Sequence, residues 1–311
     1  MNHIAILGLG GVGGYLGGML AQCYQNDPAV QISFICRGEH LQIIQKYGLH
    51  VKTPSLDFIA KPDFITDQPN SLNPVDFIFC CTKSYGLKTS LDSLVNCITP
   101  HTVFIPILNG IDSYEQIKNL FPNNPVWNAC IYIVSRRIAP GEIIVSGIEP
   151  KLIYGTEQVS ESEISKFKNI LETASIPAFH TQEILKAMWE KYLFISPVAS
   201  LSSWLNLTIG EFRIIPKHIE TILQLINELK TIALKLEIPI DPNIINIVMD
   251  RVHFLPPETT SSMHTDFINN SETELESLTG HVVRLARSIQ IPVPMYEKIY
   301  NGLKVKNDLY K

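Results

Sequence analysis

Short apolar runs alternate with helical patterns through the first half of the chain. The apolar runs predict strands at Ile4–Leu7, Ile32–Ile35, Phe77–Cys81, Val103–Ile107 and Val126–Val134. Helical periodicity separates these strands, at Val12–Tyr24, Gly38–Tyr47, Leu87–Cys97 and Ser113–Leu120. Strands that are apolar throughout and alternate with helices are typical of a parallel sheet covered on both faces. The first half is therefore predicted to be a doubly wound α/β domain.

The pattern changes near residue 180. Before that point, two further strand-like runs and a polar helix are predicted, at Ile143–Ser146, Leu152–Tyr154 and Glu161–Thr173. After it the periodicity is helical, and long helices are predicted at Glu183–Leu205, Lys217–Leu236, Asn243–Arg251 and Glu272–Gln290. We therefore predict two domains, an α/β domain over residues 1–180 and an all-α domain over residues 181–311.

Composition agrees with two folded domains and argues against several kinds of partner. The 311 residues are 45% hydrophobic and 18% charged, which is enough apolar material for real cores. The net charge is -5 and no run of Lys and Arg occurs, which argues against binding to nucleic acid or to an anionic membrane. We see no signal peptide and no apolar segment of the ~20 residues that a membrane span needs, and we predict a cytoplasmic protein.

Cysteine spacing gives no sign of a metal site. The sequence contains no CxxC pair and no Cys/His cluster with the spacing of metal ligands. Most of the six cysteines lie in apolar segments, which is typical of buried, reduced thiols in a cytosolic protein. They are Cys23, Cys36, Cys80, Cys81, Cys97 and Cys130.

A glycine-rich loop follows the first predicted strand and opens the first predicted helix. In this context Gly8 permits a tight turn, Gly10 lets the backbone approach a pyrophosphate, and Gly13 lets helix and strand pack closely. The helix N-terminus offers free N–H groups to the phosphates. The alternative is a glycine turn with a packing role only. We predict a Rossmann-type dinucleotide site on Gly8, Leu9, Gly10, Gly11, Val12 and Gly13.

Arg37 stands just past the end of the second predicted strand. An acidic residue there would hold the free ribose hydroxyls of NAD, whereas a guanidinium can pair with the 2′-phosphate of NADP. We therefore predict NADP (NADPH) as the cofactor. The alternative is a solvated surface arginine, which would be indicated if NADH bound as tightly as NADPH and Arg37→Ala left the ratio unchanged.

Two polar pairs follow later strands of the predicted sheet. Thr82 and Lys83 come after Phe77–Cys81, and Asn109 and Gly110 come after Val103–Ile107. Ligands of doubly wound sheets bind at the carboxyl ends of strands, so these residues are predicted to line the cofactor site. Taken singly, each pair is more often a helix cap or a turn.

The helical half carries one lysine and one group of glutamates that could belong to a site. Lys191 lies in a long apolar helical stretch, where a lysine whose stem covers the core is the ordinary alternative. Glu274 lies in a stretch with two other glutamates, each of which is by default a solvated helix face. Neither residue is assigned a role by its pattern alone.

Taken together, these residues resemble the ketopantoate reductase (2-dehydropantoate 2-reductase) family over nearly the whole chain. Order and spacing match together, which is more specific than any single motif. Besides the glycine loop, the resemblance rests on Arg37, Thr82-Lys83, Leu108-Asn109-Gly110, Trp189-Glu190-Lys191, Thr260-Ser261-Ser262-Met263 with Asp266, Glu272-Thr273-Glu274-Leu275 and Ile291-Pro292-Val293-Pro294.

The resemblance implies a Rossmann domain, a helical domain and an active site in the cleft between them. It implies hydride transfer from NADPH to the ketone of a 2-keto acid, with ketopantoate as the default substrate and (R)-pantoate, a precursor of pantothenate and coenzyme A, as the product. The matching positions make Lys191 the general acid and place Glu274 near the lysine and the cofactor. They make Asn109 a neighbour of nicotinamide and substrate, Lys83 a cofactor-side lysine, and Ser262 a substrate contact.

The sequence departs from the family where the substrate should be held. Members that make pantoate usually carry asparagines four and eight residues after the lysine, where this chain has Ile195 and Ala199. A third expected asparagine is Ile209. Ser196 and Ser200 stand beside the first two positions and are predicted to bind substrate in their place. Because amide partners are lost, the reaction type is better supported than the identity of the keto acid.

Three alternatives remain open at this stage. The chain could reduce a different branched or bulkier 2-keto acid, or bind NADP as a sensor without turnover, although retention of Lys191 and Glu274 speaks against the sensor. A methyltransferase that uses S-adenosylmethionine can also carry a glycine loop, but Arg37 in place of an acidic ribose ligand argues against it. The sequence allows a homodimer and equally a monomer.

Overall fold

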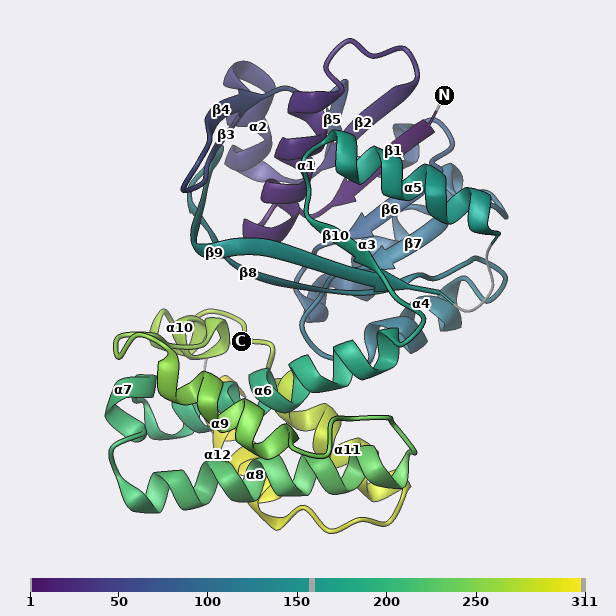
Figure 1. Cartoon of the computed structure of the whole chain (residues 1–311). Helices are drawn as coiled ribbons and strands as arrows, with labels where there is room; N and C mark the ends of the chain where they lie inside the picture. Colours follow the sequence, from purple (N-terminus) through teal and green to yellow (C-terminus); the bar gives the residue numbers. More distant parts are fainter. Residues whose placement is uncertain (1, 157–159, 309–311) are drawn as a thin grey trace. The chain divides into compact units, whose positions relative to one another are not determined.

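The computed structural model describes residues 2–156 and 160–308 and divides the chain into two compact units (Figure 1). One unit contains the chain through Leu108 together with Ser113–Ile184. The other contains Asn109–Asp112 and the chain from Leu185 onward. The short segment Asn109–Asp112 is thus part of the helical unit although it lies inside the α/β part of the sequence.

A parallel sheet of five strands forms the centre of the α/β unit. Its order is β5-β2-β1-β6-β7, and every pair along it is parallel. The strand order reverses at β1, so the loops after β1 and β6 lie at the switch point where such sheets bind ligands. The strands are β1 (Asn2–Leu7), β2 (Val30–Ile35), β5 (Phe64–Thr66), β6 (Phe77–Cys80) and β7 (Val103–Pro106).

Both faces of this sheet are buried, as its continuous apolar strands predict. Ile4 and Ile6 of β1 belong to one core, and Ala5 and Leu7 belong to the core on the other face. The predicted doubly wound α/β fold, followed by a helical C-terminal part, is confirmed. The helices of this unit are α1 (Gly11–Cys23), α2 (Gly38–Tyr47), α3 (Leu87–Asp92), α4 (Ser113–Leu120) and α5 (Glu161–Thr173), with short 3₁₀ turns at Pro69–Ser71, Ser84–Gly86 and Val95–Cys97.

A second, mixed sheet was not predicted. Of the predicted strand Val126–Val134, Val126 does pair in parallel with Phe104 of β7, but the residues from Asn128 onward belong to β8, which pairs antiparallel with β9. The two separate runs predicted at 143–146 and 152–154 are parts of one strand. They look separate in the sequence because the residues between them are mostly exposed and interrupt the apolar pattern. The strands of this sheet are β3 (Leu49–Lys52), β4 (Asp57–Ala60), β8 (Asn128–Ala139), β9 (Glu142–Gly155) and β10 (Ala178–His180).

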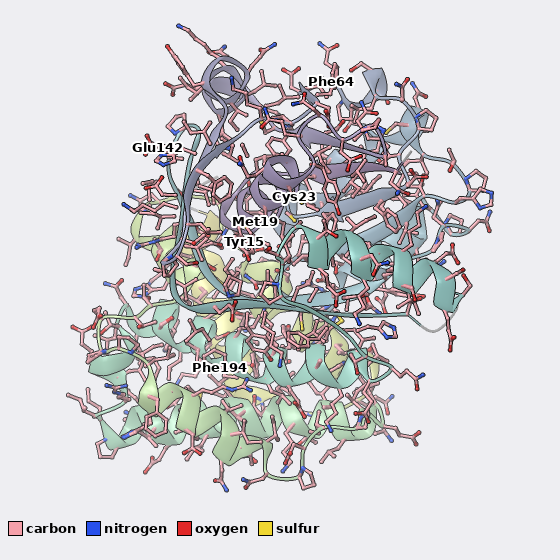
Figure 2. All side chains as sticks on the ribbon, turned by 45° about the horizontal axis from the view of Figure 1, so that its top comes forward. Tyr15, Met19, Cys23, Phe64, Glu142 and Phe194 are labelled. Carbon is pink, nitrogen blue, oxygen red and sulfur yellow. The ribbon has the colours of Figure 1, made fainter. Side chains whose placement is uncertain are left out.

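Helix α1 lies between the two sheets (Figure 1). Its glycines make that position possible. A Cβ atom on Gly14 would lie 2.5 Å from Ile143 in β9, and one on Gly17 would lie 2.8 Å from the ring of Phe34 in β2. The large side chains of α1 follow another stripe, where Tyr15 and Met19 are buried (Figure 2). The helix backbone can therefore approach side chains of both sheets closely.

Helix α5 closes the same core. Ser160 begins the helix with a capping box in which it exchanges hydrogen bonds with Glu163. The end of α1 is tied to α5 because the Tyr24 hydroxyl donates to the Ile170 carbonyl at 3.0 Å. Phe167 contacts four aromatic rings from both sheets, namely Phe77, Phe79, Trp127 and Tyr154.

The second unit is helical. Its elements are α6 (Ile184–Leu205), α7 (Ile209–Phe212), α8 (Pro216–Lys235), α9 (Ile244–Phe254), α10 (Ser262–Ile268), a π-helical turn η4 (Glu276–Gly280), α11 (His281–Ser288) and α12 (Pro294–Asp308). The single helix predicted over Glu272–Gln290 is thus a π-helical turn followed by α11. Helix α12 was not predicted. Its first turn is held by the buried carboxyl group of Glu228 in α8, which accepts from the N–H groups of Met295 and Tyr296.

Candidate active site

The glycine loop joins β1 to α1 and leaves the start of that helix accessible. Gly8 has a φ of +92°, and a Cβ atom on Gly13 would overlap the Gly8 carbonyl, so both positions require glycine. No side chain caps the helix at Gly10, and nothing lies within 4 Å of a Cβ atom there. The free N–H groups of the first turn are suited to the phosphates of a dinucleotide.

Two buried hydroxyl groups flank this loop. Among the described residues, Thr82 Oγ1 and Ser135 Oγ are buried and have no hydrogen-bond partner. Thr82 follows β6 and contacts Gly8, while Ser135 on β8 passes directly over Gly11. Unsatisfied buried polar atoms are uncommon and often mark a ligand site. Together with the open position at Gly10, they show that these residues fit a dinucleotide.

Ser135 could not be found by sequence pattern, because its strand belongs to the second sheet. Thr82 and Lys83, by contrast, were singled out by their place after β6. Lys83 begins the 3₁₀ turn Ser84–Gly86. Both stand at the carboxyl edge of the parallel sheet, where the sequence places them.

Arg37 lies at the start of α2 and is exposed. It borders a hollow of about 430 Å³ on the α/β unit. The hollow is lined by Arg37, Glu39, His40, Arg137, Ile138, Ala139 and Pro140. An arginine at this place agrees with the role that its position after β2 predicts.

Lys191 and Asn109 meet within the helical unit. Lys191 lies on α6, and its Nζ donates a hydrogen bond to Asn109 Oδ1 at 3.3 Å. Asn109 reaches it because the segment Asn109–Asp112 packs with this unit, aided by Gly110, whose φ is +101° and whose Cβ position lies 3.4 Å from Ser277. Two residues that are 82 positions apart in sequence are thus brought together.

Glu274 is 3% exposed and lies two residues before the π-helical turn Glu276–Gly280. Its backbone carbonyl accepts from the Ser277 hydroxyl and the Leu278 N–H. The turn is held against α6 by Tyr192, whose hydroxyl donates to the carbonyls of Ser277 and Leu278. π-Helical turns free carbonyl groups from the helical ladder and occur often at functional sites.

Ser196 and Ser200 lie inside the helical core, and both are 0% exposed. The Ser196 hydroxyl donates to the Leu278 carbonyl at 2.6 Å and contacts the Tyr296 hydroxyl. Ser200 contacts the hydroxyl of Thr279 at 2.8 Å. These partners connect α6 to the π-helical turn. The hydrogen bonds of both serines are therefore used within the protein, which favours a structural role for these hydroxyls over the predicted contact with substrate.

Ser262 is exposed at the first residue of α10. The helix is capped by Ser261, which accepts from the N–H of His264. His264 is buried, and its ring nitrogens bond to Thr260 and, at 3.0 Å, to Asn206. Burial lowers the pKa of His264, so the ring is neutral and accepts from one partner while donating to the other. This network, which the sequence did not reveal, holds the segment that presents Ser262.

Two family models cover almost the whole chain. The model described as Ketopantoate reductase PanE/ApbA matches residues 4–157, and the model of its C-terminal part matches residues 183–307. The chain belongs to the ketopantoate reductase family. It is accordingly an oxidoreductase, of a family that acts on small keto acids with a pyridine nucleotide.

Individual relatives agree with this membership. A 2-dehydropantoate 2-reductase of Porphyromonas gingivalis is 30% identical, with a TM-score of 0.84 over 97% of this chain and 99% of its own. An uncharacterized oxidoreductase (YkpB) of Bacillus subtilis is 25% identical over 96% of this chain and 97% of its own. The fold is also shared, at 21% identity, a TM-score of 0.88 and 99% coverage of both chains, with a D-mandelate dehydrogenase solved with NADH and anilino(oxo)acetate.

The three positions at which this ketopantoate reductase homologue lacks asparagine belong to its apolar core. Ala199 and Ile209 are buried, and Ile195 packs against the same helical core. Apolar side chains there cannot donate to or accept from a polar substrate.

Over 2–156 and 160–308, no group of three or more His, Cys, Asp or Glu is arranged to bind a metal ion. Across the same residues, each helix is too short or too polar to traverse a bilayer.

Proposed function

We propose that the protein reduces the ketone of a 2-keto acid to a 2-hydroxy acid with NADPH, and that ketopantoate, giving (R)-pantoate, is the first substrate to test. The observation that carries this proposal is the hydrogen bond from Lys191 to Asn109. It orients an ammonium group on α6, a helix of predominantly apolar residues. A charged donor held in place is what reduction of a carbonyl requires.

Lys191 has two tasks in this proposal. Its Nζ donates a proton to the carbonyl oxygen of the keto acid, and its charge stabilises the alkoxide that develops there. Asn109 Oδ1 accepts one of the three ammonium hydrogens, which directs the other two. When bound, the reduced nicotinamide supplies the hydride. Glu274, buried before the π-helical turn, is proposed to act beside Lys191, and Ser262 to contact the substrate.

The glycine loop and the residues around it are proposed to hold the cofactor. The N-terminus of α1 binds the pyrophosphate, Thr82 and Lys83 border the cofactor at the end of β6, and Arg37 pairs with the 2′-phosphate that distinguishes NADPH from NADH. The exposed guanidinium of Arg37 supports NADPH, although a relative of the same fold was solved with NADH.

A second substrate class is favoured by a specific observation. Apolar side chains replace the expected amide groups at Ile195, Ala199 and Ile209. A substrate hydroxyl group would lose its hydrogen bonds to water there without gaining a partner, so a keto acid without that hydroxyl is favoured. This alternative keeps the reaction and the roles of Lys191 and Asn109, and it changes only the side chain of the substrate.

The role of Lys191 is tested by Lys191→Ala. We expect keto-acid reduction to fall by about 10²–10⁴-fold while the affinity for NADPH stays close to that of the wild type, because the lost group acts on the carbonyl. Steady-state kinetics and a fluorescence titration with NADPH measure the two quantities. The matched control is Lys186→Ala, since Lys186 lies on the same helix and makes no hydrogen bond to Asn109.

Two results would overturn this assignment. One is a Lys191→Ala variant that keeps wild-type turnover. The other is a wild-type protein that binds NADPH and shows no turnover with any keto acid, which would indicate a sensor instead of an enzyme.

A further inference from the structure

The hollow beside Arg37 contains a second arginine. Arg137 comes from the end of β8, a strand of the other sheet, and lines the same space of about 430 Å³ as Arg37. Both side chains are exposed, and within residues 2–156 and 160–308 neither forms an ion pair. Glu39 is the acidic residue of the hollow, so two cations and one anion face this space.

The pairing of β8 explains why Arg137 faces the cofactor loop. Side chains two residues apart in a strand share a face, so Arg137 lies on the same face as Ser135. Ser135 passes over Gly11 at the start of α1. Arg137 also stands opposite Ile143 of β9, whose side chain contacts Gly14 of α1. The neighbour Arg136 projects from the opposite face of the strand.

His40 fixes this end of β8 to the glycine loop. One ring nitrogen, Nε2, bonds to the Leu9 carbonyl at 2.9 Å, and the other, Nδ1, accepts from the Gly141 N–H at 2.8 Å. Gly141 lies in the turn that follows β8. Since the imidazole is rigid, the loop that binds pyrophosphate and the strand that carries Arg137 are held at a fixed separation.

The electrostatic influence of Arg137 reaches the end of β2. Burial raises the pKa of Cys36 to about 12, and the charge of Arg137 opposes that rise. Burial also lowers the pKa of His40, and Arg137 lowers it further. Cys36 directly precedes Arg37, so the charge of Arg137 acts next to the residue that carries the first guanidinium group. Two like charges without a carboxylate partner repel each other until an anion lies between them.

We propose that Arg137 is a specificity-determining residue which, together with Arg37, binds the 2′-phosphate of NADPH. Guanidinium groups bind phosphate through paired N–H donors, and two of them can contact different oxygens of one phosphate dianion. The proposal rests on the proposed function in so far as that function requires NADPH. It adds a second residue of β8, beside Ser135, to the region around the glycine loop.

The test is direct binding, without turnover. NADPH and NADH are titrated against the wild type and against Arg137→Ala, Arg37→Ala and Arg136→Ala, the last being the control on the opposite face of β8. We expect Arg137→Ala to weaken NADPH binding about tenfold or more and to leave NADH binding unchanged, as for loss of a hydrogen bond to a charged group. The same variant should weaken binding of adenosine 2′,5′-bisphosphate and not of 5′-AMP.

The outcomes separate the two proposals. If Arg37→Ala abolishes the preference for NADPH and Arg137→Ala does not alter it, the assignment of Arg137 is wrong and the proposed cofactor stands. If Arg137→Ala weakens NADH as much as NADPH, the residue acts on the fold and the assignment is again wrong. If the wild type binds both cofactors equally and neither arginine matters, the proposed use of NADPH fails as well.

Discussion

A single neutral histidine connects the two parts of the cofactor-binding region. His40 is buried at the start of α2, where it bonds to Leu9 in the glycine loop and to Gly141 in the turn after β8. Because Nδ1 accepts a hydrogen bond, the ring can serve both partners only while it is unprotonated. Burial, and then the charge of Arg137, lowers the pKa of His40 and keeps it in that state.

The lowered pKa of His40 makes stability depend on pH in a predictable direction. The unfolded chain binds a proton near the ordinary pKa of about 6.5, whereas the folded protein resists doing so. The stabilising contribution is present above that pH and is lost as the pH falls toward the lowered pKa of the folded state. We expect the unfolding temperature of the wild type to fall more steeply on acidification below about pH 6.5 than that of His40→Gln.

The comparison with His40→Gln isolates this residue, since His264, whose pKa is also lowered by burial, is present in both proteins. Parallel curves of unfolding temperature against pH would contradict the role given to His40.

At this scale the sequence revealed residues that stand directly after strands of the central sheet. Arg37, Thr82 and Asn109 could be placed because parallel strands end at one edge, and Lys191 because of the family resemblance. His40 and Arg137 could not be placed in the same way. Their roles depend on contact between segments about a hundred positions apart, which no local periodicity encodes.

At the scale of elements, hydrogen bonds join α6 to the π-helical turn that follows Glu274. Tyr192 and Ser196 both donate to the Leu278 carbonyl in this turn. The serines that the sequence suggests as replacements for substrate-binding amides bond within the protein, Ser196 to the Leu278 carbonyl and Ser200 to the Thr279 hydroxyl. The position of Glu274 therefore depends on these hydrogen bonds.

Ser196→Ala distinguishes a structural from a substrate-binding hydroxyl. We expect the free energy of unfolding to fall by about 1–3 kcal/mol, because the Tyr296 hydroxyl and the Leu278 carbonyl lose a buried partner. The KM for keto acid should change little. Ser203→Ala is the control, since the Ser203 hydroxyl on the same helix is buried with no hydrogen-bond partner among the described residues. A raised KM with unchanged stability would return Ser196 to the substrate site.

Element boundaries show what periodicity can and cannot predict. The structure reproduces α2 and α4 at the predicted bounds, because each has one apolar face and begins and ends within polar sequence. The short strands β3, β4 and β5 escaped prediction, since three or four residues carry too little alternation to recognise. The predicted helix Leu87–Cys97 ends at Asp92, after which the chain turns into the 3₁₀ segment Val95–Cys97.

At the scale of the whole molecule, the chain supplies two kinds of chemistry in two compact units. The α/β unit carries the glycine loop, the unsatisfied hydroxyls and the arginines suited to a dinucleotide. The helical unit carries Lys191, Glu274 and Ser262, and it includes Asn109 from the other half of the sequence. The proposed reductase requires both sets of residues, so its activity tests the molecule as a whole.

The most direct measurement follows the consumption of NADPH and of NADH by the purified protein with a panel of 2-keto acids that includes ketopantoate and 2-ketoisovalerate. We predict consumption that depends on the keto acid, is faster with NADPH than with NADH, and yields the 2-hydroxy acid. Equal rates with the two keto acids would favour the substrate without a hydroxyl group while leaving the reaction intact. The absence of keto-acid-dependent consumption with either cofactor would contradict the proposed function.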